Sequence, residues 1–515
     1  MKKVISIAMV IFFLLSVPSI FAAGAPAQPQ RGGTLRIITD GVPTNFGHPK
    51  EIRGGKAPVF GCLEQLINLD DQGNIIPMLA TSWDTDPVNK TITYHLRKGV
   101  KFHDGTEFNA AAAKWNLEQR LATKQMSGGE YITSIEAIDA YTVRINVNQY
   151  SALFPTFYPF LSLMYSPTAI QTKGEEWARA NPVGTGPYKF AEYRRNAYLK
   201  FTRFDDYWGG KPYLDGVEFR IVPDPMTASA SIRAGEADAW TSTTGLTAKE
   251  VVDLKQMGFK ATYIAGFMMN LIPDSANPDS PYSKKGVREA IEYAIDKAAM
   301  AKTLGYGLMD AAYQMAVPTS AGYNRDYKGR SYDPAKAKTL LAEAGYPNGF
   351  KTKMIIQSSA LYRDAATALQ AYLMAVGIDA QLDVADTARF NSLTWDTSGK
   401  NTWKDSLILS NMPLDPGLLF TDMFIRYFKP GARFASLARP PEFAALVAKG
   451  YTATDTATVR SWNQQMVKQL ADNATVIPIL TIPYPIVTQK YVHTKFLAVP
   501  CPGVWDMSSD WMEKK

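Results

Sequence analysis

Residues 181–222 form the segment that most constrains the fold of this chain of 515 residues. The segment opens with PVGTGP at 182–187, where glycine and proline indicate a tight, ordered loop. Residues 188–193 then alternate aromatic with polar side chains, which is the period of a half-buried strand. A turn and a second strand at 198–203 complete a hairpin, and an aromatic turn leads to a third strand at 217–222. Spacing alone therefore predicts an antiparallel hairpin packed on a core.

Four further motifs follow one another along the chain: RGGTLRII at 31–38, LRKGVKFHDGTEF at 96–108, VREAIEYAID at 287–296 and YDPAKAKTLLAEAGY at 332–346. With the loop, hairpin, aromatic turn and strand of 181–222, they resemble the family 5 (peptide/nickel-type) substrate-binding proteins of ABC importers. The resemblance covers nearly the whole chain after its first 25 residues. Each motif is moderately specific by itself, whereas all of them in the right order are a strong indication.

This resemblance implies an α/β, two-lobed periplasmic binding protein fold (type II, cluster C), with mixed sheets, an inserted subdomain and a ligand cleft flanked by a hinge. Helices and strands indeed alternate after residue 266, in a βαβ-like rhythm. The expected divisions are a signal peptide at 1–25, lobe I at 26–55, 182–265 and 485–515, an inserted subdomain at 56–181, and lobe II at 266–484. The hinge is expected at 269–271 and 482–485, where a few residues absorb the backbone change of lobe closure.

Local signals predict where two helices begin and end. Asn109 is expected to cap a helix at 110–120. Asp333 followed by Pro334 is the pattern of an N-cap with proline at the first helical position, and Gly345 is expected to end that helix.

The first residues have the pattern of a secretory signal peptide. Lys2 and Lys3 precede an apolar run at 4–17, and small residues that include Ala23 and Ala25 follow. The run is too short for a membrane-spanning helix of about 20 residues. No cysteine stands near the cleavage region for lipid attachment. We therefore expect a periplasmic protein without a lipid anchor.

Composition indicates a globular protein, and the resemblance implies that it acts with membrane partners. A mature chain of this length exceeds a single core, so two or three domains are expected. Lysine and arginine are scattered, so the net charge of +7 indicates a solvated surface and no nucleic-acid partner. No later stretch is long and apolar enough to span a membrane, so transport requires separate ABC permease and ATPase subunits. The protein itself is expected to be a monomer.

The two cysteines, Cys62 and Cys501, leave two alternatives open. An exported chain in an oxidising compartment pairs its cysteines in many cases, and the family layout brings the last 30 residues towards the region of Cys62. The alternative is two separate buried thiols, which behave as small hydrophobic groups.

Enzyme signatures are absent from the sequence. It contains no Gly-x-Ser-x-Gly elbow, no His-Glu-x-x-His, no phosphate loop ending in Gly-Lys-Ser/Thr and no Cys-x-x-Cys. His103 and Asp104 precede Gly105, so turn chemistry is a better interpretation than an acid/base pair. The four histidines lack the local spacing of metal ligands, at positions 48, 95, 103 and 493. No enzyme, metal or cofactor is predicted, although nickel-carrying relatives leave a role for His48 open.

The remaining chemistry is that of a binding cleft at the lobe junction. Aromatic side chains bury much area at low entropic cost, and an arginine holds a carboxylate through two hydrogen bonds. The candidate ligand-binding residues are Asn45, Phe46, His48, Trp240, Met269, Asn270, Trp395, Trp403, Asn411, Met412, Asp415, Arg426 and Tyr427. Each tryptophan and methionine has ordinary core packing as its alternative, and Arg426 has a surface role as its alternative.

The expected function is that of an importer's solute-binding protein, which captures a peptide-class or other small organic solute. The alternatives are a secreted hydrolase with an unrecognised site and a binding protein for nickel or another metal complex. Turnover of a candidate substrate would distinguish the first alternative, and metal retained through dialysis would distinguish the second.

One departure from the family pattern bears on the ligand. Peptide-binding relatives commonly carry an aspartate three residues before the Asp of an Asp-Pro pair, where it meets the peptide's terminal ammonium. Here the pair is Asp415 and Pro416, and the position is Met412. A thioether cannot offset the desolvation of a buried ammonium. We therefore predict that unmodified peptides bind weakly and that the ligand is apolar, anionic or amine-blocked, with Arg426 as the candidate anchor for an acid group.

Overall fold

The computed structural model describes residues 28–42, 45–50, 57–70, 74–160, 162–242, 246–395, 403–414, 417–418, 420–429, 433–494 and 507–514. The expected signal peptide, Asp415 and Cys501 lie outside these ranges. Within them, no helix is long and apolar enough to cross a membrane.

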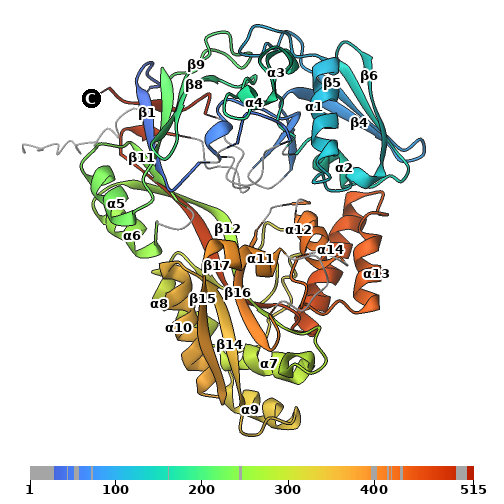
Figure 1. The fold of residues 1–515 in the computed structure, drawn as a ribbon, viewed down its shortest axis with the longest axis vertical. Helices are drawn as coiled ribbons and strands as arrows, with labels where there is room; N and C mark the ends of the chain where they lie inside the picture. The colour runs from blue at the N-terminus through green and yellow to red at the C-terminus, as the bar shows by residue number, and fades with distance from the viewer. Residues whose placement is uncertain are drawn as a thin grey trace, which may run out of the picture.

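One mixed sheet of 11 strands runs through both halves of the molecule (Figure 1). Its order is β15-β14-β16-β12-β17-β11-β1-β10-β9-β8, and β13 pairs with β17. The long strands β12 (Lys260–Pro273) and β17 (Ile477–Thr488) connect the upper half to the lower half in Figure 1. The other strands of this sheet are β1 (Thr34–Thr39), β8 (Tyr188–Arg194), β9 (Tyr198–Arg203), β10 (Gly216–Ile221), β11 (Ala239–Thr241), β13 (Asp310–Ala311), β14 (Phe350–Gln357), β15 (Ile378–Ala385) and β16 (Ser406–Pro413).

Lobe I contains the predicted hairpin, which is confirmed as β8 and β9, followed by β10. Helices α5 (Pro225–Arg233) and α6 (Ala248–Gln256) pack on one face of its sheet. Distant parts of the chain meet there, because Asp238 binds Arg36 across 2.7 Å and accepts a hydrogen bond of 2.7 Å from the Tyr491 hydroxyl. The smaller elements are η1 (Ala57–Val59), β18 (Val492–His493) and β19 (Trp511–Met512).

The inserted subdomain has its own four-stranded sheet, in the order β4-β5-β7-β6, with α1 packed against it. Asn109 caps α1 as predicted, since its side chain accepts a hydrogen bond from the amide of Ala112. The elements of this region are β2 (Ile67–Leu69), β3 (Ile75–Pro77), β4 (Ala80–Asp86), β5 (Thr91–Leu96), α1 (Ala110–Ala122), η2 (Gly129–Tyr131), β6 (Ile132–Asp139), β7 (Thr142–Val147), α2 (Phe154–Phe157), α3 (Pro167–Lys173) and α4 (Glu175–Ala178).

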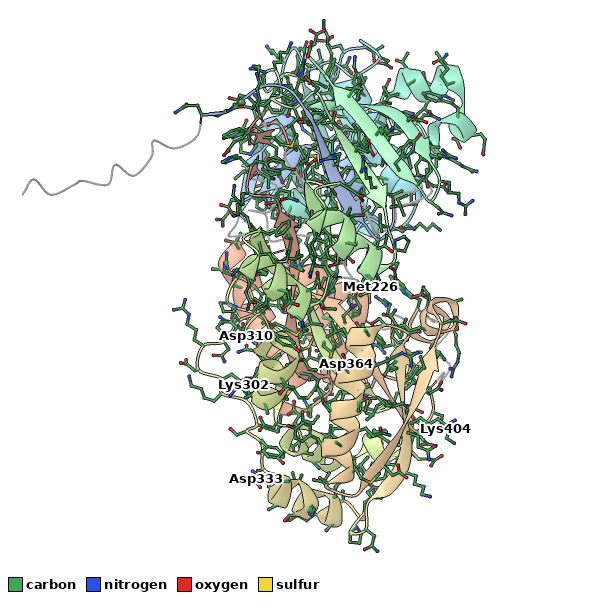
Figure 2. All side chains as sticks on the ribbon, turned by 90° about the vertical axis from the view of Figure 1, so that its left-hand side faces the viewer. Met226, Lys302, Asp310, Asp333, Asp364 and Lys404 are labelled. Carbon is green, nitrogen blue, oxygen red and sulfur yellow. The ribbon has the colours of Figure 1, made fainter. Side chains whose placement is uncertain are left out.

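Lobe II covers both faces of its part of the sheet with helices, so its core has two layers. Figure 2 shows lobe II below Met226 of the lobe I helix α5, with Asp333 at its far end. Asp333 caps α9 as predicted, and Gly345 follows the helix with a φ of +90°. The helices are η3 (Pro281–Ser283), α7 (Lys285–Ala294), α8 (Lys297–Gly305), α9 (Pro334–Glu343), α10 (Ala360–Met374), α11 (Thr387–Thr394), α12 (Phe420–Phe428), α13 (Pro441–Lys449) and α14 (Thr456–Asp472).

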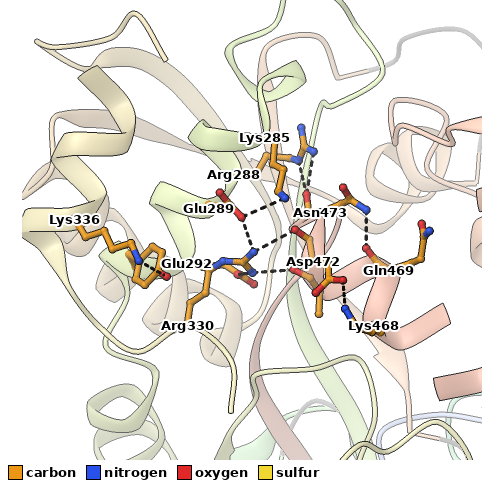
Figure 3. Close-up of polar contacts among 12 residues, drawn as sticks. Lys285, Arg288, Glu289, Glu292, Arg330, Lys336, Lys468, Gln469, Asp472 and Asn473 are labelled. Carbon is orange, nitrogen blue, oxygen red and sulfur yellow. Dashed lines mark hydrogen bonds and ion pairs between the residues drawn. The ribbon is translucent and has the colours of Figure 1, made fainter. Parts of the chain in front are cut away.

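Arg330 connects α7 to the end of α14 inside lobe II, through ion pairs to α7 and hydrogen bonds to α14 (Figure 3). Arg330 binds Glu292 across 2.5 Å and Glu289 across 2.6 Å. The same guanidinium donates to the backbone oxygens of Ala471 and Asp472, at 2.8 and 3.2 Å. These carbonyls belong to the last turn of α14, where a cation is favourable because it opposes the helix dipole.

The PVGTGP loop packs directly on the backbone of Cys62. An added Cβ at Gly184 would lie 2.2 Å from the carbonyl oxygen of Cys62, and one at Gly186 would lie 2.8 Å from its carbonyl carbon. Two glycines are therefore required for this close approach. Cys62 itself is a buried free thiol, and Cys501, the other cysteine of the two alternatives, lies outside the described residues.

Candidate functional site

The two lobes are joined where β12 and β17 pair with each other. On the lobe I side, residues 486–488 of β17 pair with β11, and on the lobe II side Phe267 is the first residue of β12 to pair with β16. The register of β12 against β17 shifts between Ala265 and Phe267, at Gly266, whose added Cβ would lie 2.6 Å from the oxygen of Ile482. The crossing thus lies at 263–266, slightly before the expected 269–271.

Polar side chains follow the parallel strands β1 and β11 where they end beside this crossing. Ser242 Oγ donates a hydrogen bond of 2.9 Å to Asp40 Oδ2, and Thr241 Oγ1 donates one of 2.9 Å to the hydroxyl oxygen of Tyr484. Burial raises the pKa of Tyr484 to about 12, so its hydroxyl stays neutral. Ligands of open α/β sheets bind outside the carboxyl ends of the strands. This polar cluster therefore forms a candidate lobe I wall of the cleft.

A cavity of about 600 Å³ lies beside the crossing, on the edge of the sheet. Tyr263, Ile482 and Pro483 line it from the crossing strands, and Tyr313 and Leu414 line it from lobe II. Another lining residue, Gln314, has its amide bound to the backbone N–H and oxygen of Asn324, at 2.9 and 2.8 Å. The cavity offers mainly rings and apolar groups, which suit the apolar part of a small molecule.

The structure places the predicted residues of the first loop in the core of lobe I. Phe46 is fully buried, with its ring 5.2 Å from that of Tyr193. His48 is 2% exposed, and its Nδ1 accepts the backbone N–H of Lys50 at 3.1 Å. Asn45 is half-buried. Phe46 and His48 are therefore packing residues here, and Asn45 stays a candidate.

The predicted residues of the central strands are also buried. Trp240 packs with α5 and α6, and Met269 packs in the lobe II core. Asn270 is fully buried; its Nδ2 donates to the oxygen of Met268 at 2.7 Å, while its Oδ1 has no hydrogen-bond partner among the described residues. A buried acceptor without a partner lowers stability. Of Trp240, Met269 and Asn270, Asn270 is therefore the best candidate to contact a ligand.

The lobe II candidates divide into two groups. Met412 is fully buried and Asn411 half-buried, both on β16. Trp403 and Tyr427 are buried, and both pack against Phe434, with ring centroids 6.1 and 5.8 Å away. Trp403 comes just before the first residue of β16, and it is the last residue of β16 that lies at the crossing. The structure therefore does not bring Trp403 together with Asn270 or Asn411.

The three remaining lobe II candidates are Trp395, Arg426 and Asp415. Trp395 is 58% exposed, and the guanidinium of Arg433 lies 3.6 Å from its ring centroid. This is a cation–π contact at the surface. The side chain of Arg426 and the whole of Asp415 fall outside the described residues, so their roles stay predictions.

The only candidate catalytic group of the sequence is part of a turn. Asp104 Oδ1 accepts from the backbone N–H and the hydroxyl of Thr106, at 3.0 and 2.6 Å. His103 lies against the glycine loop, where burial lowers its pKa to about 4 and raises that of Cys62 to about 12. Both groups are neutral, so they do not form a thiolate–imidazolium pair. No group of three or more potential metal ligands occurs among the described residues.

Sequence reasoning missed the polar cluster of Asp40, Thr241, Ser242 and Tyr484. The available signal was positional, because Asp40 and Ser242 each come directly after a strand of lobe I, β1 and β11. No sequence pattern indicated that Tyr484 belongs to this cluster, because Tyr484 reaches it only through the pairing of β17 with β11.

Curated relatives are similar to a little more than half of the chain. Heme-binding protein A of Haemophilus influenzae is 33% identical over 316 residues, which cover 55% of this chain and 56% of the relative. Glutathione-binding protein GsiB of Escherichia coli K12 is 35% identical over 339 residues, which cover 63% of this chain and 64% of the relative. The chain thus matches less than two thirds of the length of each.

Solved structures match over nearly the whole chain. DppA of Helicobacter pylori in complex with the peptide STSA has a TM-score of 0.79 at 23% identity, with 94% of this chain and 99% of that chain covered. AgaA of A. tumefaciens R10 in complex with agropinic acid has a TM-score of 0.76 at 25% identity, with the same coverage. NikA of Brucella suis in complex with Fe(III)-EDTA has a TM-score of 0.80 at 24% identity and covers 93% and 100%.

These likenesses confirm the two-lobed type II fold that the motifs implied. A family model described as bacterial extracellular solute-binding proteins, family 5 middle, matches residues 74–413, which is more than half of the sequence. The family consists of binding proteins, so it gives the hydrolase alternative no support. The chain belongs to the family 5 bacterial extracellular solute-binding proteins.

Proposed function

We propose that this protein is the extracytoplasmic solute-binding component of an ABC importer. In this role the two lobes close on a small organic solute, and the closed form delivers it to a membrane permease that an ATPase drives. The observation that carries the proposal is the pair of strands β12 and β17, which, within the described part of the chain, are the two strands that pair in both lobes. A connection this narrow permits one lobe to rotate against the other.

We further propose that the protein is a periplasmic monomer and that its ligand is anionic. Relatives are named for glutathione and heme, and a structural neighbour holds agropinic acid; all three ligands carry carboxylates. Met412 is fully buried, so this position offers no charge to a peptide's ammonium group. The ligand contacts proposed for this site come from Asn45, Asn270 and Asn411, with Arg426 as the anchor for an acid group.

Native mass spectrometry of freshly purified protein is the direct test. We expect a co-purified small molecule that is lost after unfolding and refolding. Calorimetry then compares S-methylglutathione, hemin and matched tripeptides with free or acetylated amino termini. Binding of hemin, S-methylglutathione (which carries two carboxylates beside its single ammonium group) or the acetylated tripeptides supports the proposal, whereas sub-micromolar binding of the α-linked tripeptides with free amino termini contradicts the ligand class. Failure of every compound and absence of any co-purified molecule would contradict the binding role itself.

A further inference from the structure

The inserted subdomain contacts lobe II at a second place, away from the strand crossing. The backbone N–H of Ala152 donates to the oxygen of Ala453 at 2.8 Å. The side-chain amide of Gln149 donates to the oxygen of Tyr451 at 2.9 Å. Ser127 Oγ also donates to Asp422 Oδ1, on α12. We call this contact, between residues 127–154 and residues 422–459, the clasp.

Tyr451 is the centre of the clasp. It belongs to the linker between α13 and α14, yet it is only 6% exposed because its ring packs in the core of the subdomain. Its ring centroid lies 5.1 Å from that of Tyr131 and 6.0 Å from that of Phe154. Val459 of α14 is fully buried in the same cluster. Contacts of this kind stabilise beyond the area that they bury.

The clasp and the crossing lie at different places along the boundary between the lobes. Figure 1 shows α1 and α2 of the subdomain directly above α12, α13 and α14 of lobe II, to one side of β12 and β17. The lobes are therefore held together at two separated positions. The crossing is covalent, whereas the clasp consists of side-chain packing and a few hydrogen bonds.

We propose that the clasp is a latch that holds the closed form and opens when a ligand enters or leaves. This inference rests on the proposed function, because it gives the subdomain a part in lobe closure. Tyr451 then sets the fraction of closed protein without touching the ligand. Apparent affinity falls in proportion to the fraction of protein in the binding-competent state. Residues of the clasp therefore determine affinity and dissociation rate from outside the cleft.

Small-angle scattering of ligand-free protein gives the first test, with Tyr451→Ala and Tyr451→Phe as a matched pair. Tyr451→Phe keeps the ring contacts and is expected to retain the wild-type radius of gyration. Tyr451→Ala removes them and is expected to increase the radius of gyration, with circular dichroism unchanged. An unchanged scattering profile for a folded Tyr451→Ala variant would overturn the latch.

A cross-link gives the second test and does not depend on how Tyr451→Ala folds. The hydrogen bond between Ala152 and Ala453 brings their backbones within reach of a disulfide. The variant Ala152→Cys/Ala453→Cys is compared in its oxidised and reduced forms, with S-methylglutathione as a probe that carries no thiol. We expect oxidation to slow association and dissociation about tenfold or more. Equal rates would contradict the latch.

The two proposals fail in different ways. If the wild type binds neither S-methylglutathione nor any other compound of the panel, the binding role fails. The scattering comparison of Tyr451→Ala with Tyr451→Phe still decides whether the clasp holds the lobes together, because it requires no ligand.

Discussion

The hydroxyl group of Tyr207 donates a hydrogen bond of 2.7 Å to Oε1 of Glu64, whose carboxylate is buried in the protein. Glu64 Oε2 accepts two more, from Thr185 Oγ1 at 2.7 Å and from Trp208 Nε1 at 2.9 Å. All three donors come from the 181–222 segment that the sequence marked as most informative. The aromatic turn thus supplies hydrogen-bond donors to a buried carboxyl group and holds the subdomain onto lobe I, which gives both rings a structural role there.

Glu64→Gln is expected to lower the free energy of unfolding by about 1–3 kcal/mol, because an amide N–H₂ would then face one of these donors. Urea unfolding measures the change. Glu107→Gln is the matched control, since Glu107 also accepts a tyrosine hydroxyl, that of Tyr141, but is exposed. The control should change stability by less than about 0.5 kcal/mol. Equal effects of the two substitutions would contradict the structural role of Glu64.

Gly184→Ala is expected to destabilise the fold by about 3 kcal/mol, because the new Cβ would clash with the carbonyl oxygen of Cys62 at 2.2 Å. Thermal unfolding compares it with Gly41→Ala. No atom lies within 4 Å of a Cβ at Gly41, so this control should be nearly neutral. A wild-type melting temperature for Gly184→Ala would show that the loop does not pack as described.

His103 makes the stability depend on pH between about 4 and 6.5. Its Nε2 donates to the oxygen of Gly186 at 2.8 Å, and its Nδ1 accepts the N–H of Gly184 at 3.4 Å, so the half-buried ring is neutral. Burial lowers its pKa from 6.5 to about 4. Between these values the unfolded chain binds more protons than the folded one, so stability rises with pH and is lost as the pH falls. The loss reaches up to about 3 kcal/mol for a shift of this size.

Urea unfolding at pH 7, 5.5 and 4.5 measures this dependence, with His103→Gln as the comparison. The variant lacks the titrating ring, so its stability should fall less over the same range even if it is less stable at pH 7. Parallel slopes for the variant and the wild type would exclude His103 as the source.

Arg330→Ala is expected to cost about 3–5 kcal/mol, because Glu292 is only 2% exposed and would lose its partner. Lys285→Ala removes another cation from the same cluster, at 3.7 Å from Glu289, but Lys285 is half exposed (Figure 3). Exposed pairs contribute little, so the control should cost about 0.5 kcal/mol or less. Chemical denaturation measures the free energy of unfolding of both variants. Equal losses would contradict the claim that burial makes the Arg330 ion pair the more stabilising one.

The sequence predicted those parts of the fold whose causes are local. The hairpin of β8 and β9 follows from alternation over a few residues, and the caps at Asn109 and Asp333 follow from single side chains next to a helix. The 14-residue strand β12 was not predicted, because it pairs with β17 along nearly its whole length and with β16 over its lobe II half, and both partners are distant in sequence. No window of the sequence contains both partners.

The candidate site was less predictable, since burial depends on neighbours that are distant in sequence. Phe46 and Trp240 were expected to contact the ligand from loops at the lobe junction, and Met412 from its place three residues before Asp415. Each is buried against helices or strands of its own lobe. The sequence contains only a weak indication that Glu64 is buried, namely that this acid lies in the mainly apolar run from Cys62 to Leu69. A charge in such a run requires partners, and only the fold identifies them as Tyr207, Trp208 and Thr185.

Gly266 is expected to control the movement of the lobes, because β12 passes β17 there at a distance that excludes a side chain. A Cβ at this residue would lie 2.6 Å from the oxygen of Ile482 and 2.9 Å from the nitrogen of Tyr484. Gly266→Ala should therefore push the strands apart at the crossing, lower stability by about 2 kcal/mol and change the radius of gyration of the ligand-free protein. Gly286→Ala in α7 is the control, since its Cβ would have no atom closer than 3.6 Å. Alanine in a helix should stabilise lobe II by up to about 1 kcal/mol and leave the scattering profile unchanged. If both variants scatter like the wild type, the crossing at 263–266 is not where the lobes bend.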